Sequence, residues 1–229
     1  IMVSSVGEVA MSAVSLVTNF SAVIINLLVA LASGGSIVTS QLLGAQKYRD
    51  AKRSTGQVIT MTFLSSLVIA TICLCFNKPL LQLIFGKIED SVLSNAVTYF
   101  TYDAASYPLM ALCAAGGAIL RSKGDSKTMF YISIFRNVIN IVGNAVCIYL
   151  LKMGVAGAAI PTLISRGVSV ALIFWLLSRS KDALRPARED LKTLDRVVIK
   201  NMLKLGLPAA FEGCMFQLGS VLSLSMITL

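Results

Sequence analysis

Three asparagines lie on one predicted helix face inside an otherwise apolar stretch, "NVINIVGN", at Asn137, Asn140 and Asn144. Their spacing of three and then four residues places their side chains on neighbouring turns of an α-helix. Amides in this position commonly hydrogen-bond to a neighbouring membrane helix, and their carbonyl oxygens could also coordinate a cation or bond a protonated carboxylate. The residues alone favour the packing role and leave the binding role open.

Charged side chains also lie well inside apolar stretches. Asp103 stands in "YFTYDAASYPLM", with Tyr99 and Tyr107 one turn to either side. A carboxylate at the centre of a bilayer costs roughly 2.5 to 3.5 kcal/mol on insertion scales, so Asp103 should face a cavity or a partner. It is either a protonatable site or a structural acid that is neutral or bonded to tyrosine.

Arg166 follows Thr162 by one helical turn, and Glu212 lies inside the last apolar block. We expect Arg166 to form an ion pair across the bundle, with Asp103 or with an acid upstream of Ile1, and this pair has either a structural or a gating role. Glu212 is a functional candidate because acidic residues inside membrane spans are rare and usually have a function.

The elements that carry these residues are expected to be membrane helices. The sequence is 56% hydrophobic with a mean hydropathy of +0.80, and only 14% of its residues are charged, whereas a soluble domain carries about 25% charge. Its apolar blocks are long enough to cross a bilayer, which takes roughly 20 residues of helix, and they lack the alternation of a β-barrel strand. The predicted fold class is an all-α integral membrane protein, a helical bundle.

About six to seven transmembrane helices are predicted. The first uncharged run, 9–46, is too long for one straight span, and its helix should end within "ALASGGSIVTSQLLGAQ". The other blocks predict helices at about 55–76, 92–120, 129–151, 155–178 and from 198 to beyond 220.

Lysine and arginine predict the orientation of these spans. Cations concentrate in "KYRDAKR", in "RSKGDSK" and in the long connection that begins "RSKDALRPARED", which are separated by two spans each. The positive-inside rule therefore places these loops in the cytoplasm of a multi-pass plasma-membrane protein. The net charge of +9 then lies at the membrane edge and does not indicate a nucleic-acid partner.

Several chemistries are disfavoured by composition. Histidine is absent, and the five cysteines are scattered in apolar surroundings without the paired spacing of a metal site. We expect these cysteines to be buried apolar side chains. No convincing nucleophile and base are present, so an enzyme is not expected.

Four stretches in order carry a resemblance: "SVGEVAMSAVSLVTNF", "VTSQLLGAQKYRDAKRSTGQ", "ILRSKGDSKTMFYISIFRNVINIVGN" and "GVAGAAIPTLISR". Together they resemble the multidrug and toxic compound extrusion (MATE) family over nearly the whole chain. The resemblance implies one half of a twelve-helix, two-lobed transporter, from the end of its first helix to its seventh. It implies an amino-terminal lobe at 1–178, a basic linker at 179–197 and the first, truncated helix of the second lobe at 198–229.

The resemblance also implies site residues. Asn140 and Asn144 fall on the family's fifth helix and Thr162 on its sixth, at positions lining a cation pocket that could hold Na⁺ at the two asparagines. Some relatives have aspartate at the position of Asn144, and the family's aspartate on the first helix would precede Ile1. In the second lobe, the glutamate typical of sodium-coupled members is replaced by Phe216, and Glu212 lies one turn earlier.

The predicted function is therefore an antiporter driven by Na⁺ or H⁺, without an organic cofactor, that exports amphipathic and often cationic small molecules by alternating access. Membrane lipid and organic cations are its expected partners, and the full-length protein is expected to be a monomer. The alternative is a flippase for a lipid-linked saccharide precursor, whose pyrophosphate Arg136 and Arg166 would have to bind. A non-transporting membrane scaffold is disfavoured by the polar residues inside the spans.

Overall fold

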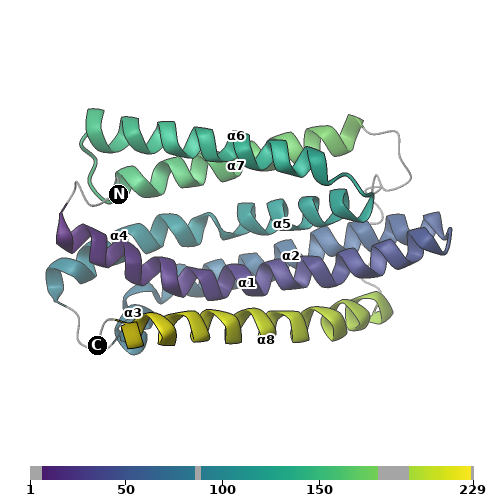
Figure 1. The fold of residues 1–229 in the computed structure, drawn as a ribbon, viewed down its shortest axis with the longest axis horizontal. Coiled ribbons are helices and arrows are strands. Elements are labelled where there is room, and N and C mark those ends of the chain that lie inside the picture. The colour runs from purple at the N-terminus through teal and green to yellow at the C-terminus, as the bar shows by residue number, and fades with distance from the viewer. Residues whose placement is uncertain (1–6, 86–88, 180–195, 228–229) are drawn as a thin grey trace.

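The computed structural model describes residues 7–85, 89–179 and 196–227, and these residues form a bundle of helices (Figure 1). The elements in chain order are α1 (Glu8–Gly44), α2 (Tyr48–Cys75), α3 (Asn77–Phe85), α4 (Asp90–Ala105), α5 (Tyr107–Ser122), α6 (Ser126–Ala145), the short π-helical segment η2 (Val146–Leu150), α7 (Ala156–Arg179) and α8 (Arg196–Ile227).

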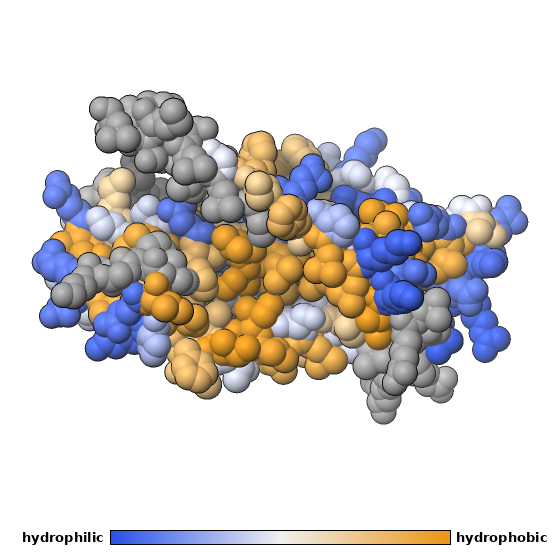
Figure 2. Space-filling model, turned by 90° about the horizontal axis from the view of Figure 1, so that it is seen from below, coloured by the Kyte–Doolittle hydropathy of each residue, from blue (hydrophilic) through white to orange (hydrophobic). Residues whose placement is uncertain are grey.

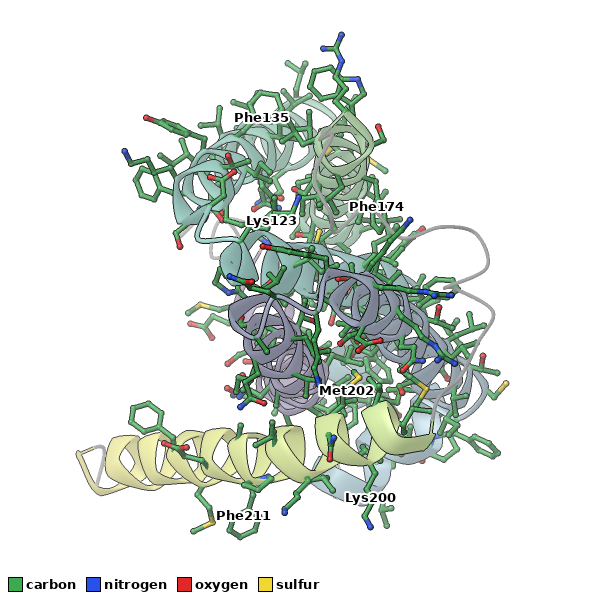
Figure 3. All side chains as sticks on the ribbon, turned by 90° about the vertical axis from the view of Figure 1, so that its right-hand side faces the viewer. Lys123, Phe135, Phe174, Lys200, Met202 and Phe211 are labelled. Carbon is green, nitrogen blue, oxygen red and sulfur yellow. The ribbon has the colours of Figure 1, made fainter. Side chains whose placement is uncertain are left out.

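The helices form layers. In Figure 1, α6 and α7 lie along one side, α4 and α5 come next, α1 and α2 follow, and α8 lies on the opposite side. Helix α8 is seen side-on in Figure 1 and again in Figure 3, where most other helices are viewed close to end-on, so it crosses the bundle obliquely. In Figure 3, Met202 points from α8 into the bundle, whereas Lys200 and Phe211 point away from it.

Long apolar helices account for the predicted membrane spans. Among the described residues, α1, α2, α6 with η2, and α7 are long and apolar enough to cross a membrane, and α4 with α5 qualifies as a bent pair. Helix α8, at 32 residues, also has the length of a span. The prediction of an all-α membrane bundle is confirmed.

The first helix differs from the prediction. Most of the run predicted to be too long for one straight span is a single helix of 37 residues, which extends about 55 Å at 1.5 Å per residue. The hydrocarbon core of a bilayer is only about 30 Å thick, so α1 is long enough to project beyond it. The helix does end within the expected segment, at Gly44, and the left-handed backbone of Gln46 (φ 58°) turns the chain toward α2.

The span predicted at 92–120 is broken in two at Ser106. Helices α4 and α5 meet there at an angle of 42°. Pro108 lies in the first turn of α5, and because proline lacks an N–H it cannot continue the hydrogen-bond ladder of α4. Proline is tolerated at a helix start, so the chain restarts as a second helix.

The surface matches a bilayer. In Figure 2, which views the α8 side, hydrophobic side chains form a band across the middle and hydrophilic ones gather toward both ends. The end of α1, the start of α2, the α5–α6 connection, the end of α7 and the start of α8 all lie at one end of the bundle (Figure 1). The structure thus brings the basic segments 47–53 and 121–127 together. Most of the predicted linker, 180–195, lies outside the described residues.

Two glycines permit close helix packing. A Cβ on Gly34 of α1 would lie 2.6 Å from the carbonyl oxygen of Met202 on α8, and a Cβ on Gly143 of α6 would lie 2.8 Å from Cβ of Pro161 on α7. Small residues at such contacts let membrane helices approach each other closely. The second contact adjoins Asn144 and so fixes how α6 presents its asparagines to α7.

Candidate functional site

A chain of hydrogen bonds joins α6 to α7 through the predicted asparagines. The Nδ2 of Asn144 donates to Oδ1 of Asn140 at 3.0 Å, and Nδ2 of Asn140 donates to Oγ1 of Thr162 at 3.0 Å. The Thr162 hydroxyl then donates to the carbonyl of Ala158 at 3.0 Å. We call Asn144, Asn140 and Thr162 the amide chain. Its three hydrogen bonds all run in the same direction, from Asn144 toward Ala158.

The amide chain has a spare acceptor at its far end. Oδ1 of Asn144 is buried and has no hydrogen-bond partner among the described residues. A buried amide oxygen without a partner costs about 1 to 3 kcal/mol, so this position has a physical reason to accept a cation or a proton donor. Asn137 lies on the same helix face but is exposed and forms no hydrogen bond within the described part of the chain.

Asp103 and Arg166 form the ion pair that the sequence predicted. Nη1 of Arg166 lies 3.0 Å from Oδ1 of Asp103, and the two side chains are 13% and 6% exposed. The other carboxylate oxygen of Asp103 accepts from the hydroxyl of Ser21 on α1 at 2.5 Å. Because that bond uses the only hydrogen of Ser21, the Tyr107 hydroxyl, 2.9 Å away, donates to Ser21.

The same group of residues stabilises the break between α4 and α5. Arg166 donates to the hydroxyl of Ser106, and Ser106 donates to the carbonyl of Asp103 at 2.6 Å. We call Ser21, Asp103, Ser106, Tyr107 and Arg166 the paired cluster. It connects α1, α4, α5 and α7 at the bend, and the two carboxylate oxygens and the Ser21 and Ser106 hydroxyls all have partners.

A cavity adjoins both groups of residues. It measures about 220 Å³ and lies between α5, α6 and α7. Its lining residues are Met110, Arg136, Asn137, Asn140, Thr162, Ser165 and Arg166. The structure therefore brings Asn140, Thr162 and Arg166 to one space, which the sequence could not show.

Glu212 does not join this site. It lies on α8, on the other side of the bundle from α6 and α7 (Figure 1), is exposed, and has no ion-pair partner within the described ranges. Among the described residues, no group of three or more Cys, Asp or Glu side chains could hold a metal ion. The polar site is built from amides and hydroxyls, with one neutralised ion pair beside it.

Sequence reasoning missed Ser21 and Ser106. Hydroxyls in membrane helices usually bond their own backbone, as Thr62 does with the carbonyl of Val58 at 2.6 Å. No spacing rule links Ser21 to Asp103, since 82 residues separate them. The serine immediately before "YP" marks the helix restart and was the one available signal.

Long apolar helices with partnered polar groups inside define a polytopic membrane protein with a polar interior. A family model described as MatE matches residues 1–146. The chain is 30% identical over 228 residues to the probable multidrug resistance protein YoeA of Bacillus subtilis, covering 96% of this chain and 49% of YoeA. The chain belongs to the MatE family, as the resemblance implied, and it spans about half the length of the curated relatives it matches.

Solved structures give the same result. An inward-facing multidrug resistance MATE family transporter of the MOP superfamily superposes with a TM-score of 0.83 at 26% identity, covering 95% of this chain and 49% of the other. An outward-facing one superposes with a TM-score of 0.81 at 24% identity, covering 93% and 47%, which shows the fold alone. These neighbours are transporters, in agreement with the prediction that the chain is not an enzyme.

Proposed function

We propose that this chain forms the amino-terminal lobe, residues 1–178, and the first helix of the second lobe, residues 198–229, of a cation-coupled exporter, joined by the linker at 179–197. Na⁺ or H⁺ would drive the transport, and amphipathic small molecules, organic cations among them, would be the cargo. The membership of the MatE family supports the class of protein. The plasma membrane, with the basic end of the bundle in the cytoplasm, is its proposed location.

The observation that carries the proposal is the unpartnered Oδ1 of Asn144 at the end of the amide chain. A cation bound there would gain an oxygen ligand that no described residue occupies. A proton would instead arrive on a donor group, for example a protonated carboxyl, that bonds to the same oxygen. Either event adds an interaction that is absent from the empty lobe, and a ligand shifts a conformational equilibrium only through such a difference in affinity.

The proposal includes alternating access, in which the lobe moves as a rigid body. The chain superposes almost equally well on an inward-facing and an outward-facing structure, with TM-scores of 0.83 and 0.81. A similar fit to both states is what a lobe that keeps its internal structure would give. This supports a rocking motion of one lobe against the other, in which the intact protein works as a monomer within membrane lipid.

The flippase alternative required two intramembrane arginines for a pyrophosphate. Arg166 already forms an ion pair with Asp103 at 3.0 Å. Of these two arginines, only Arg136 has no carboxylate partner among the described residues. A single guanidinium is a weak ligand set for a pyrophosphate, so export of small amphipathic molecules is the better supported function.

The test uses the intact gene product in proteoliposomes. Efflux of a fluorescent organic cation is measured under an imposed sodium gradient and, separately, under an imposed proton gradient. The Asn140→Ala/Asn144→Ala variant is compared with Asn95→Ala, whose amide donates only to the Ser91 carbonyl of its own helix. Efflux under one gradient that is lost in the double variant and kept in Asn95→Ala supports the proposal. Efflux in the wild type that survives the double substitution contradicts it.

A further inference from the structure

The cavity between α5, α6 and α7 is lined in part by positively charged residues, which is unusual for a site proposed to bind cations. Met110 is the one apolar residue in its lining, and the lining holds two arginines and no carboxylate. Asp103 neutralises Arg166 from behind the cavity. Arg136 is half-buried and has no carboxylate partner among the described residues. The cavity therefore carries a net positive charge.

Arg136 lies well inside the predicted membrane span, where an unpaired charge is costly. It is the eleventh residue of α6, which places it about 15 Å along the helix axis from the helix start. The Arg136 side chain lines the cavity. A guanidinium partly removed from water at membrane depth is stabilised by an anionic partner.

The hydrogen-bond donors around the cavity identify where that partner would bind. The Asn140 amide, the Thr162 hydroxyl and the Ser165 hydroxyl already donate within the lobe. The side chains of Arg136 and Asn137 make no hydrogen bond within the described residues, so all of their N–H groups are available to a ligand. A guanidinium offers paired N–H groups that match a carboxylate in a bidentate geometry.

We propose that this cavity binds the carboxylate of an amphipathic substrate, with Arg136 as the principal ligand and Asn137 as a second donor. The inference rests on the proposed function, because the ligand is the cargo of the exporter. It narrows this cargo to molecules that carry a carboxylate, with or without a cationic group. The neutralised Arg166 forms the far wall. A carboxylate in the cavity also offsets the charge that would otherwise repel a cation from the neighbouring amide chain.

The experiment compares two dyes that differ by one methyl ester. Rhodamine 110 carries a free carboxylate, and rhodamine 123 is its methyl ester. Binding of each to the intact, purified gene product in detergent micelles is followed by fluorescence polarisation. We expect the wild type to bind rhodamine 110 about tenfold more tightly than rhodamine 123, the difference expected of a charged hydrogen bond.

Variants assign the preference to Arg136. Arg136→Gln is expected to abolish the difference between the dyes, and Arg136→Lys to keep part of it because the charge remains while the bidentate geometry is lost. Lys127→Gln removes one exposed charge from the first turn of the same helix and should keep the full preference. Equal unfolding midpoints for Arg136→Gln and Lys127→Gln show that the comparison is made on folded protein.

Either of two results overturns the inference: a wild type that does not distinguish the dyes, or a preference that persists in Arg136→Gln. The assay needs no ion gradient, so it is independent of the efflux test. A wild type that shows no dye preference but still has gradient-driven efflux contradicts the carboxylate site and leaves the proposed function standing. A dye preference assigned to Arg136 without any gradient-driven efflux supports the site and contradicts the proposed function.

Discussion

The paired cluster and the amide chain are both polar groups of residues inside one apolar lobe, but they differ in completeness. In the paired cluster, both oxygens of Asp103 have partners, with Arg166 at 3.0 Å and Ser21 at 2.5 Å. In the amide chain, each donor atom has an acceptor, whereas one buried acceptor, Oδ1 of Asn144, has no partner. A complete network stabilises one arrangement of helices, whereas an incomplete one gains free energy when a ligand completes it.

Position in the bundle reinforces this difference. The paired cluster links four helices at the bend between α4 and α5, so it fixes the geometry of the lobe. The amide chain joins only α6 to α7 and borders the cavity. We therefore assign the paired cluster to stability and the amide chain to function, and the two respond differently to substitution.

The largest effect is expected for Asp103→Asn, which leaves the Arg166 side chain, only 13% exposed, without a charged partner. Breaking a buried ion pair from one side costs about 3 to 5 kcal/mol, measured as the free energy of unfolding in mixed detergent micelles. The double variant Asp103→Asn/Arg166→Gln should recover much of this loss because no unpaired charge remains. A single variant as stable as the wild type would show that the cluster does not hold the bend.

The next largest effect is expected for Ser21→Ala. This change removes the donor to one oxygen of Asp103 and the acceptor of the Tyr107 hydroxyl, at a cost of about 1 to 3 kcal/mol. Ser15→Ala, at an exposed position of the same helix, is the matched control and should leave the unfolding free energy unchanged. Equal losses for the two serines would remove Ser21 from the cluster.

A smaller effect is expected outside the membrane, at the amino-terminal cap of α6. The hydroxyl and backbone N–H of Thr128 donate to Asp125 and hold the pKa of this carboxyl below its usual value. Because the folded-state pKa is depressed, this stabilisation is present above the unfolded pKa of about 3.9 and is lost as the pH falls through the lower folded value. Asp125→Ala should cost about 0.5 to 1 kcal/mol at neutral pH, since the cap is only part-buried and water screens its charge.

That difference should shrink when unfolding is measured at progressively lower pH below about 4. A cost for Asp125→Ala that stays constant across this range would mean that the carboxylate charge does not contribute to the cap.

The smallest effect on stability is expected for Asn144→Ala. It removes the hydrogen bond from Asn144 to Asn140, one turn earlier on the same helix, and even amide bonds between membrane helices contribute on average only about 0.6 kcal/mol. It also removes the buried oxygen that has no partner, which offsets part of that loss. A loss of unfolding free energy as large as that for Ser21→Ala would place Asn144 in a structural role and would contradict the contrast between the two groups.

The sequence predicted the features that depend on the few charged and amide side chains inside apolar helices. Asp103 and Arg166 could be paired in advance because an intramembrane charge requires a partner and few candidates exist. The asparagine face came from helical spacing, and its link to Thr162 came from the family resemblance. The domain boundaries at 178 and 198 stay predictions.

The remaining features depend on three-dimensional packing. The end of α1 was predicted only to within the segment 30–46, because a run of small residues is compatible with a helix end and with a packing face, here against α8 at Gly34. The short helix α3 follows α2 directly and has too few residues for a periodic pattern to be distinctive. The cavity was not predictable because it forms where α5, α6 and α7 meet.

The most direct test of the assignment measures stability and transport on the same two variants of the intact gene product. Asn140→Ala/Asn144→Ala and Ser21→Ala are each reconstituted, and gradient-driven efflux per folded protein is measured beside the unfolding free energy. The account predicts that the asparagine variant loses efflux while keeping most of its stability, and that Ser21→Ala loses more stability while its folded fraction still transports. Wild-type efflux from the asparagine variant would contradict the central claim that the amide chain couples the driving cation to transport.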